Sequence, residues 1–198
     1  RFSKILIGGQ ATPPGLLERS FTVGLPVIRT YGSAETSGGV VYDGVAIGET
    51  RLRISEDGLV EISGPSLATG YLGDPELTAD NFLMDPDGSR WWRTRDLGTI
   101  TDGVLRISGR VDDVIVSGGI KVSLFEIEKV LAEAGITAVA SWFEDETWGQ
   151  VPALLSLVEL DQQSVRDEIE SRLGKAARPY RFLPVKDFPI LPSGKLDR

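Results

Sequence analysis

The feature that most constrains the fold of this chain is a change in the spacing of its apolar residues. From about residue 45 to residue 108, short segments alternate apolar and polar residues, and turns rich in Gly, Asp and Pro separate them. The clearest such segments are 50–54, 59–63 and 104–108. A period of two is typical of strands that bury one face. This stretch therefore predicts a small antiparallel sheet or β-barrel-like subdomain.

The residues before this stretch follow another pattern. The apolar segments 4–7 and 26–32 are predicted strands, and Thr12 followed by two prolines is a helix start signal. A strand, a helix and a strand in this order indicate the end of an α/β subdomain over residues 1–44. Together with the antiparallel subdomain at 45–110, it would form the C-terminal part, 1–110, of a larger N-terminal domain.

The residues after 110 change pattern again. Ser123 and Glu126 have capping-box spacing before apolar residues at helical spacing, and Gly135 is a stop signal. A second predicted helix ends at Gly174, and residues 137–143, 153–160 and 182–190 are predicted strands. We therefore expect a compact α+β domain at 111–198, so that the chain combines α/β and α+β parts.

Composition excludes several classes of function. The chain has 21 Lys and Arg against 29 Asp and Glu, a net charge of -8, which argues against a nucleic-acid partner. It has no cysteine and no histidine, so a disulfide framework, a thiolate or histidine metal site and a Ser-His-Asp triad are excluded within it. No apolar run approaches the roughly 18 residues of a membrane span, and no signal segment is recognisable. We expect a cytoplasmic protein.

Two segments carry residues suited to nucleotide chemistry. YGSAET (31–36) follows a predicted buried strand, where Tyr31 offers a flat face and Glu35 an oxygen ligand for magnesium. WWRTRDLG (91–98) places Asp96 between two predicted strands, where its carboxylate could hold the paired hydroxyls of a ribose. The alternatives are a tight turn with a solvated glutamate and an ordinary loop aspartate.

Two further segments lie in the second half. GRVDDVIVSGG (109–119) contains the donor fork of Arg110 and a Gly118-Gly119 pair that permits close approach of a ligand, or else a simple hairpin turn before a capped helix. ILPSGKLDR (190–198) presents Lys195 on a short turn. That lysine is either a solvated charge at the end of the chain or a reactive group.

In their order along the chain, six segments resemble the second half of the acyl-adenylate-forming enzymes, the superfamily of acyl-CoA synthetases, peptide-synthetase adenylation domains and luciferases. They are GGQATPPGLLERS, YGSAET, GPSLATGYLGDPELTADNF, WWRTRDLG, GRVDDVIVSGG and PSGKLDR. The resemblance implies that a carboxylate attacks the α-phosphate of ATP and that coenzyme A then captures the acyl group. It implies ATP, Mg²⁺ and coenzyme A as ligands and a small carboxylic acid as substrate.

The resemblance also implies roles for individual residues. Tyr31 would stack on adenine, Glu35 would bind the magnesium as a catalytic residue, and Asp96 would hold the ribose beside Arg110. Asp112 would be the hinge of a mobile C-terminal domain, Gly118 and Gly119 would line the coenzyme A tunnel, and Lys195 would be the catalytic lysine of adenylation. The remaining implied nucleotide contacts are Gly9, Gln10, Gly32 and Ala34. The implied acyl-pocket residues are Gly8, Gly9, Ser37 and Gly38.

The sequence departs from the family pattern in three ways. Ala34 replaces the usual Thr or Ser, Arg95 replaces a Gly, and nothing resembles the family's upstream phosphate loop. We therefore expect an N-terminal half of the same enzyme to be missing. Residues 38–44, GGVVYDG, look most like 2-succinylbenzoate–CoA ligases of menaquinone biosynthesis. The alternatives are another aryl- or fatty-acyl-CoA synthetase and a truncated, non-catalytic nucleotide-binding module. A homodimer is left open.

Overall fold

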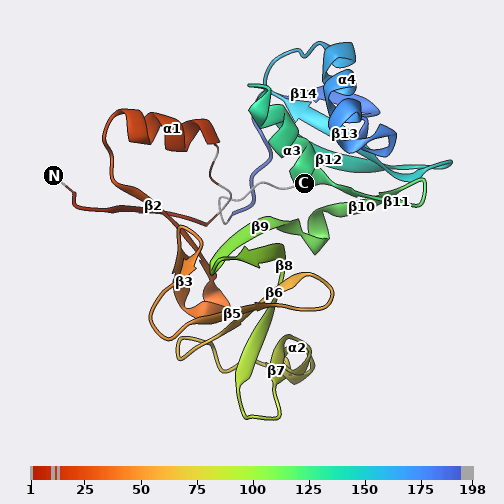
Figure 1. Ribbon diagram of the computed structural model, residues 1–198. Helices are drawn as coiled ribbons and strands as arrows, with labels where there is room; N and C mark the ends of the chain where they lie inside the picture. The colour runs from red at the N-terminus through yellow and green to blue at the C-terminus, as the bar shows by residue number, and fades with distance from the viewer. Residues whose placement is uncertain (1, 10–11, 13, 193–198) are drawn as a thin grey trace. The chain divides into compact units, whose positions relative to one another are not determined.

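The computed structural model describes residues 2–9, 12 and 14–192 of the chain (Figure 1). The chain divides into two compact units, Arg1–Ser108 and Gly109–Arg198. The fold is mixed, with helices and open sheets in both units, which confirms the predicted combination of α/β and α+β parts.

The first sheet of unit 1 begins as the sequence predicts. Strand β1 (Ile5–Ile7) pairs in parallel with β2 (Val27–Ser33), and helix α1 (Pro14–Thr22) connects them. Two short strands that were not predicted then extend the sheet: β3 (Gly38–Tyr42) pairs antiparallel with β2, and β4 (Val45–Ala46) pairs antiparallel with β3. The order of the strands is β1-β2-β3-β4.

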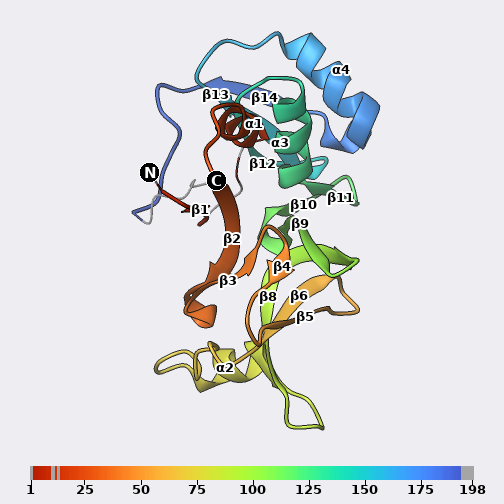
Figure 2. The same cartoon turned by 60° about the vertical axis from the view of Figure 1, so that its left-hand side comes forward.

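The turn between β3 and β4 explains the Asp-Gly pair of the GGVVYDG segment. Asp43 and Gly44 both have positive φ, 47° and 88°, as a two-residue hairpin turn requires. The Leu105 amide donates to the Gly44 carbonyl at 2.7 Å, and a Cβ on Gly44 would lie 2.7 Å from a methyl carbon of Val104. Figure 2 shows this turn beside β9 (Val104–Arg110). Gly44 is therefore needed both for its φ and for the close approach of the two segments.

The second sheet of unit 1 is antiparallel and open. Its strand order is β5-β6-β8-β7, with β9 also paired to β8, so the small β subdomain is a sheet and not a closed barrel. Helix α2, which was not predicted, precedes β7. The bounds are β5 Arg51–Ile54, β6 Leu59–Ser63, α2 Pro75–Asn81, β7 Phe82–Met84 and β8 Arg90–Thr101.

One sequence prediction for this sheet was wrong. WWRTRDLG was expected to connect two strands, but it lies within the twelve-residue strand β8. The reason is that β8 pairs with β6 before and after the polar residues, at Arg93 and Leu97, and that β7 and β9 also pair with β8. These neighbours hold in the strand polar residues that alternation alone would leave in a loop.

The two sheets of unit 1 share one hydrophobic core. Val40 and Val41 of β3 pack with Val60 and Ile62 of β6 and with Trp92 of β8. Val60 and Ile62 are fully buried, as expected for alternate residues that point to one face of a strand. This core fixes the end of β2 against the middle of β8, where the candidate site lies.

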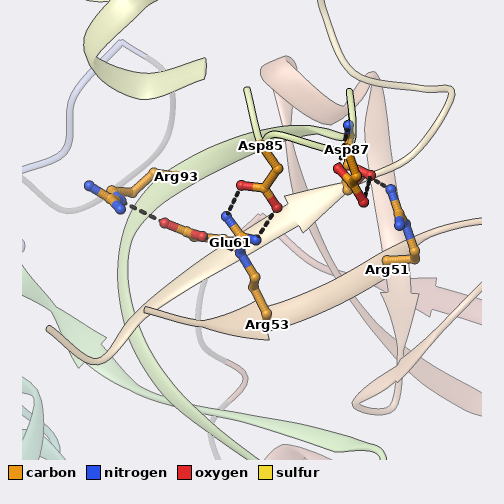
Figure 3. A network of polar contacts seen from close by, with 8 residues as sticks. Arg51, Arg53, Glu61, Asp85, Asp87 and Arg93 are labelled. Carbon is orange, nitrogen blue, oxygen red and sulfur yellow. Dashed lines mark hydrogen bonds and ion pairs between the residues drawn. The ribbon is translucent and has the colours of Figure 1, made fainter. Parts of the chain in front are cut away.

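The opposite face of the β5–β9 sheet carries an ionic network around one buried carboxylate, that of Glu61 (Figure 3). Strand register places Arg53, Glu61 and Arg93 directly opposite one another on β5, β6 and β8. The Glu61 carboxylate is 2% exposed and accepts from Arg53 Nε at 2.5 Å and from Arg93 Nε at 2.7 Å. Arg53 also pairs with both oxygens of Asp85, and its hydrogen bonds to Asp85 and Glu61 raise the pKa of the Arg53 guanidinium above its ordinary value. The same guanidinium stacks 4.1 Å from the ring centroid of Trp91.

The described part of unit 2, residues 109–192, forms one five-stranded sheet with two α-helices. The strand order is β11-β10-β13-β12, with β14 beside β13, and residues from α3 and α4 share one core with β10, β12 and β13 (Figure 1). The two helices therefore cover the same face of the sheet. The bounds are β10 Val114–Ser117, β11 Ile120–Ser123, α3 Leu124–Glu133, β12 Ala138–Asp145, β13 Gly149–Ser156, α4 Gln162–Leu173 and β14 Arg181–Pro184.

The helices of unit 2 follow their predicted boundaries more closely than one strand does. Ser123 caps α3 through the Glu126 amide, and Gly174 ends α4 with φ 86°. Strand β13, predicted at 153–160, instead covers Gly149–Ser156. The shift arises because the strand begins at the tight turn that joins it to β12, whereas Leu157 and Val158 have left the sheet and are 50% and 62% exposed.

Candidate functional site

The end of β2 positions Tyr31 and Glu35. After β2 the chain enters a single 3-10 turn, η1 (Ala34–Thr36), which Ser33 and Thr36 cap reciprocally. The capping places Glu35 on an ordered turn, half-buried, where the sequence alone left a solvated loop residue as an alternative. Gly32 makes the turn feasible, since a Cβ there would lie 2.0 Å from the Gly38 carbonyl oxygen.

Tyr31 and Asp96 meet although 65 residues separate them. The Tyr31 phenol donates a hydrogen bond to Asp96 Oδ2 at 2.7 Å. Asp96 lies in an irregular part of β8. Glu61 of β6 is opposite Arg93 and Leu59 is opposite Leu97, so β8 has two more residues than β6 between these pairs. Buried Thr94 accepts from the Asp96 amide at 3.0 Å and so supports this bulge. A bulge of this kind re-aims a side chain, here the Asp96 carboxylate.

A second phenol holds the second carboxylate. Tyr71 donates to Glu35 Oε1 at 3.0 Å, and the indole of Trp92 donates to the Tyr71 oxygen at 3.3 Å. Burial raises the pKa of Tyr71 above its ordinary value, so the phenol remains a proton donor at neutral pH. Unit 1 therefore holds two carboxylates that were singled out in the sequence, each bonded to a different tyrosine. Sequence reasoning missed Tyr71 and Trp92 as members of the site.

The glycines after β1 lie next to the same end of β2. Ile7 pairs with Arg29, so Gly8 is level with Thr30, and a Cβ on Gly8 would lie 2.2 Å from the Thr30 hydroxyl. Gly9 has φ 91°. Because the carboxyl ends of parallel strands meet at one edge of a sheet, these glycines lie beside the Tyr31 segment, as an acyl or nucleotide pocket would require.

The other implied nucleotide and pocket residues flank Glu35. Ala34 is exposed, as are Ser37 and Gly38. Ser37 has φ 57°, and its hydroxyl donates to the Ser66 carbonyl at 2.9 Å. Gln10 and Lys195 lie outside the described residues.

Unit 2 contains the remaining candidate residues that the structure describes: Arg110, Asp112, Gly118 and Gly119. Arg110 pairs with Asp112 at 3.2 Å, and both side chains are about half exposed. Gly118 and Gly119, with φ 56° and 82°, form the two-residue turn between β10 and β11. Trp148 covers this turn. A Cβ on Gly118 would lie 2.8 Å from the Trp148 ring, and the Gly118 amide donates to the Trp148 carbonyl at 2.8 Å. A hairpin turn before a capped helix, which the sequence left open as the alternative for this segment, is present, and the coenzyme A role of the two glycines stays a prediction.

Residues 2–9, 12 and 14–192 contain neither a ready-made cluster of metal ligands nor a helix suited to span a membrane. No group of three or more acidic residues gathers there in a way that could hold a metal ion without other ligands. No helix among them is long and apolar enough to cross a membrane.

Comparisons with known proteins agree with the resemblance found in the sequence. No protein-family model matches the chain. The chain is 33% identical over 98% of its length to a "Probable 2-succinylbenzoate–CoA ligase" of Mycobacterium tuberculosis, and covers 52% of that protein. It is 32% identical over its whole length to the 2-succinylbenzoate–CoA ligase of a Geobacillus strain, and covers 45% of it. The chain thus spans about half the length of these relatives.

Solved structures give the same result. The o-succinylbenzoate coenzyme A synthetase of Bacillus subtilis, in complex with the acyl-adenylate intermediate OSB-AMP, matches 98% of this chain with a TM-score of 0.81 and 28% identity. The match covers 44% of that structure. The same synthetase in complex with ATP and magnesium matches with a TM-score of 0.79 and 27% identity, over 98% of this chain and 45% of that one. The predicted resemblance to a portion of the acyl-adenylate-forming enzymes is confirmed.

Proposed function

We propose that this chain is the C-terminal part of an AMP-forming acid–CoA ligase, which activates a carboxylic acid with ATP and passes the acyl group to coenzyme A. The observation that carries the proposal is the pair of carboxylates, Asp96 and Glu35, at the positions where the family resemblance expects a ribose contact and a magnesium ligand. The complex of a similar synthetase with ATP and magnesium supports it.

Asp96 suits a ribose contact. A carboxylate has about four acceptor positions, so it can bind a phenol and ribose hydroxyls together. The bulge in β8 and the Tyr31 hydrogen bond set the direction of the carboxylate before any ligand arrives. Tyr31 would thus have two roles: its ring would stack on adenine, and its hydroxyl would orient Asp96.

Glu35 suits a magnesium ion that arrives with a nucleotide. Magnesium is usually held by one or two carboxylates together with phosphate oxygens, so a site without a cluster of acids fits this ion. Bound there, the ion would neutralise charge on the phosphates during transfer. Glu35 would orient it through a carboxylate that Tyr71 already holds.

The rest of the enzyme would pack on the first sheet. Large apolar side chains of the α1–β1 region are exposed: Phe2, Leu6, Leu16, Phe21 and Val23. Such a patch supports an interaction surface. We propose that the N-terminal half of the enzyme covers it, and that Lys195, Asp112 and the Gly118-Gly119 turn take the roles that the resemblance implies. A cytoplasmic location follows from the same proposal.

The proposed substrate is 2-succinylbenzoate, because the relatives from Mycobacterium and Geobacillus carry that name. We expect the full-length enzyme, tested with a panel of aryl and fatty acids, to release pyrophosphate from ATP with 2-succinylbenzoate at a kcat/KM at least about 10-fold above any other acid. Equal use of other aryl or fatty acids would indicate a different acyl-CoA synthetase. Failure of every acid to release pyrophosphate would favour the non-catalytic nucleotide-binding module.

Removing the Asp96 carboxylate tests the ribose contact. Asp96→Ala in the full-length enzyme is expected to weaken ATP binding by about 1.5–3 kcal/mol, the range for hydrogen bonds to a charged group. Isothermal titration with ATP measures this, and Asp102→Ala, on an exposed turn of the same unit, is the control. Equal ATP affinity in the Asp96 variant and the wild type would remove Asp96 from the nucleotide site.

A further inference from the structure

Tyr71 makes the direct side-chain contact to Glu35, and the family resemblance assigned it no role. The Tyr71 ring packs edge-on against Phe82, with ring centroids 5.6 Å apart, and its amide donates to the Thr78 hydroxyl at 2.9 Å. Its phenol bridges Trp92 and Glu35. The side chain is therefore fixed at its backbone, its ring and its hydroxyl.

The donor and acceptor groups fix the direction of the two hydrogen bonds that link Trp92, Tyr71 and Glu35. The indole nitrogen of Trp92 can only donate, so the phenol oxygen of Tyr71 accepts from it. An ionised carboxylate can only accept, so the phenol proton points to Glu35. Each bond polarises the next, and the Glu35 oxygen receives a donor that cannot easily turn away.

The backbone reinforces the same contact. The Ala68 amide donates to the Glu35 carbonyl at 2.8 Å, and the Ser37 hydroxyl reaches the Ser66 carbonyl. Arg90 donates to the carbonyls of Ala68 and Thr69, at 2.6 and 2.8 Å. The segment 66–71 and the turn that carries Glu35 are thus joined at both backbone and side chain.

We propose that Tyr71 is a positioning residue for Glu35. Its phenol holds one oxygen of the Glu35 carboxylate and so directs the other oxygen toward the metal of a bound metal–nucleotide. The inference rests on the proposed function. The inference deepens that function, because it explains why the segments GPSLATGYLGDPELTADNF and YGSAET occur in one chain: the first supplies Tyr71 and the second supplies Glu35. Groups that orient a metal ligand commonly change metal affinity 10- to 100-fold when removed.

The chain offers a matched control for this proposal. Tyr31 is also a phenol bonded to a carboxylate, but its partner is Asp96, the proposed ribose contact. Tyr31→Phe and Tyr71→Phe each remove one hydroxyl and keep the ring. The two variants should therefore affect different parts of a metal–nucleotide complex.

The test makes two measurements on the full-length enzyme. Electron paramagnetic resonance measures Mn²⁺ binding in the presence of ATP, and titration compares the affinity for ATP with the affinity for 3′-deoxy-ATP. Tyr71→Phe is expected to weaken Mn²⁺ binding about 10-fold and to leave the preference for ATP over 3′-deoxy-ATP unchanged. Tyr31→Phe is expected to reduce that preference and to change Mn²⁺ binding much less. Added to Glu35→Gln, Tyr71→Phe should have no further effect on Mn²⁺ binding.

The outcomes separate this inference from the proposed function. Wild-type enzyme that takes up no Mn²⁺ with ATP would overturn both. Wild-type uptake with unchanged Mn²⁺ affinity in Tyr71→Phe would overturn the positioning role alone. Equal loss of metal affinity and ribose preference in both tyrosine variants would show that the phenols only support the fold, and would also overturn it.

Discussion

Replacing Lys195 with alanine in the full-length enzyme is expected to slow acyl-adenylate formation about 100-fold or more, while thioester formation from supplied acyl-adenylate and coenzyme A stays near normal. The physical reason is that the phosphorus centre gathers negative charge during transfer, and a pre-placed ammonium stabilises it. Single-turnover measurements of the two half-reactions, with pyrophosphate and thioester as the readouts, test this. The role rests on the family resemblance of PSGKLDR, since Lys195 lies outside the described residues.

A second lysine provides the control for this experiment. Lys186 is exposed and follows β14, so Lys186→Ala should leave both half-reactions unchanged. Equal loss of both half-reactions in Lys195→Ala would show that Lys195 supports the structure and not the adenylation step. The simple alternative for ILPSGKLDR, a solvated charge at the end of the chain, would then stand.

Replacing Arg53 with alanine is expected to lower the free energy of unfolding by about 1.5–3 kcal/mol, the range for lost hydrogen bonds to charged groups. The change leaves Glu61, which is 2% exposed, with Arg93 alone, and it removes the partner of Asp85. It also removes the guanidinium that stacks on Trp91. Urea unfolding of the full-length protein followed by tryptophan fluorescence measures the loss.

The exposed pair of Arg29 and Asp43 in the same unit is the matched control. Both side chains are about half exposed, so Arg29→Ala should cost no more than about 1 kcal/mol. If the two arginine variants lost the same stability, burial of Glu61 would not be what makes the network matter. A second comparison, Arg93→Ala, keeps Glu61 and Asp85 paired with Arg53 and should cost less than Arg53→Ala.

Much of the fold could be predicted because the local signals are strong. The capping serine at 123, the terminal glycine at 174 and the alternation at 59–63 each act through near neighbours, and the structure places a helix or strand boundary close to each. The Asp-Gly turn at 43–44 also has a local cause, because few other residues adopt positive φ at both positions. These features depend on a few consecutive residues.

Other features could not be predicted from local pattern. Strand β8 looks like a loop from its polar residues, and it becomes a strand because it has a neighbour on each side. The open form of the β5–β9 sheet depends on which strands pair, and alternation fits a sheet and a barrel equally well. The shift of β13 by four residues follows from its turn with β12.

The sequence by itself determined which residues have the chemistry for the proposed site: Tyr31, Glu35 and Asp96 lie in segments whose order resembles one superfamily. Only the tertiary structure decided how they are held. The phenol of Tyr31 reaches Asp96 across 65 residues, and that of Tyr71 reaches Glu35 across 36. The reason is that strand register and bulges set which side chains face each other, and a one-residue change in register would turn them to opposite faces of the sheet.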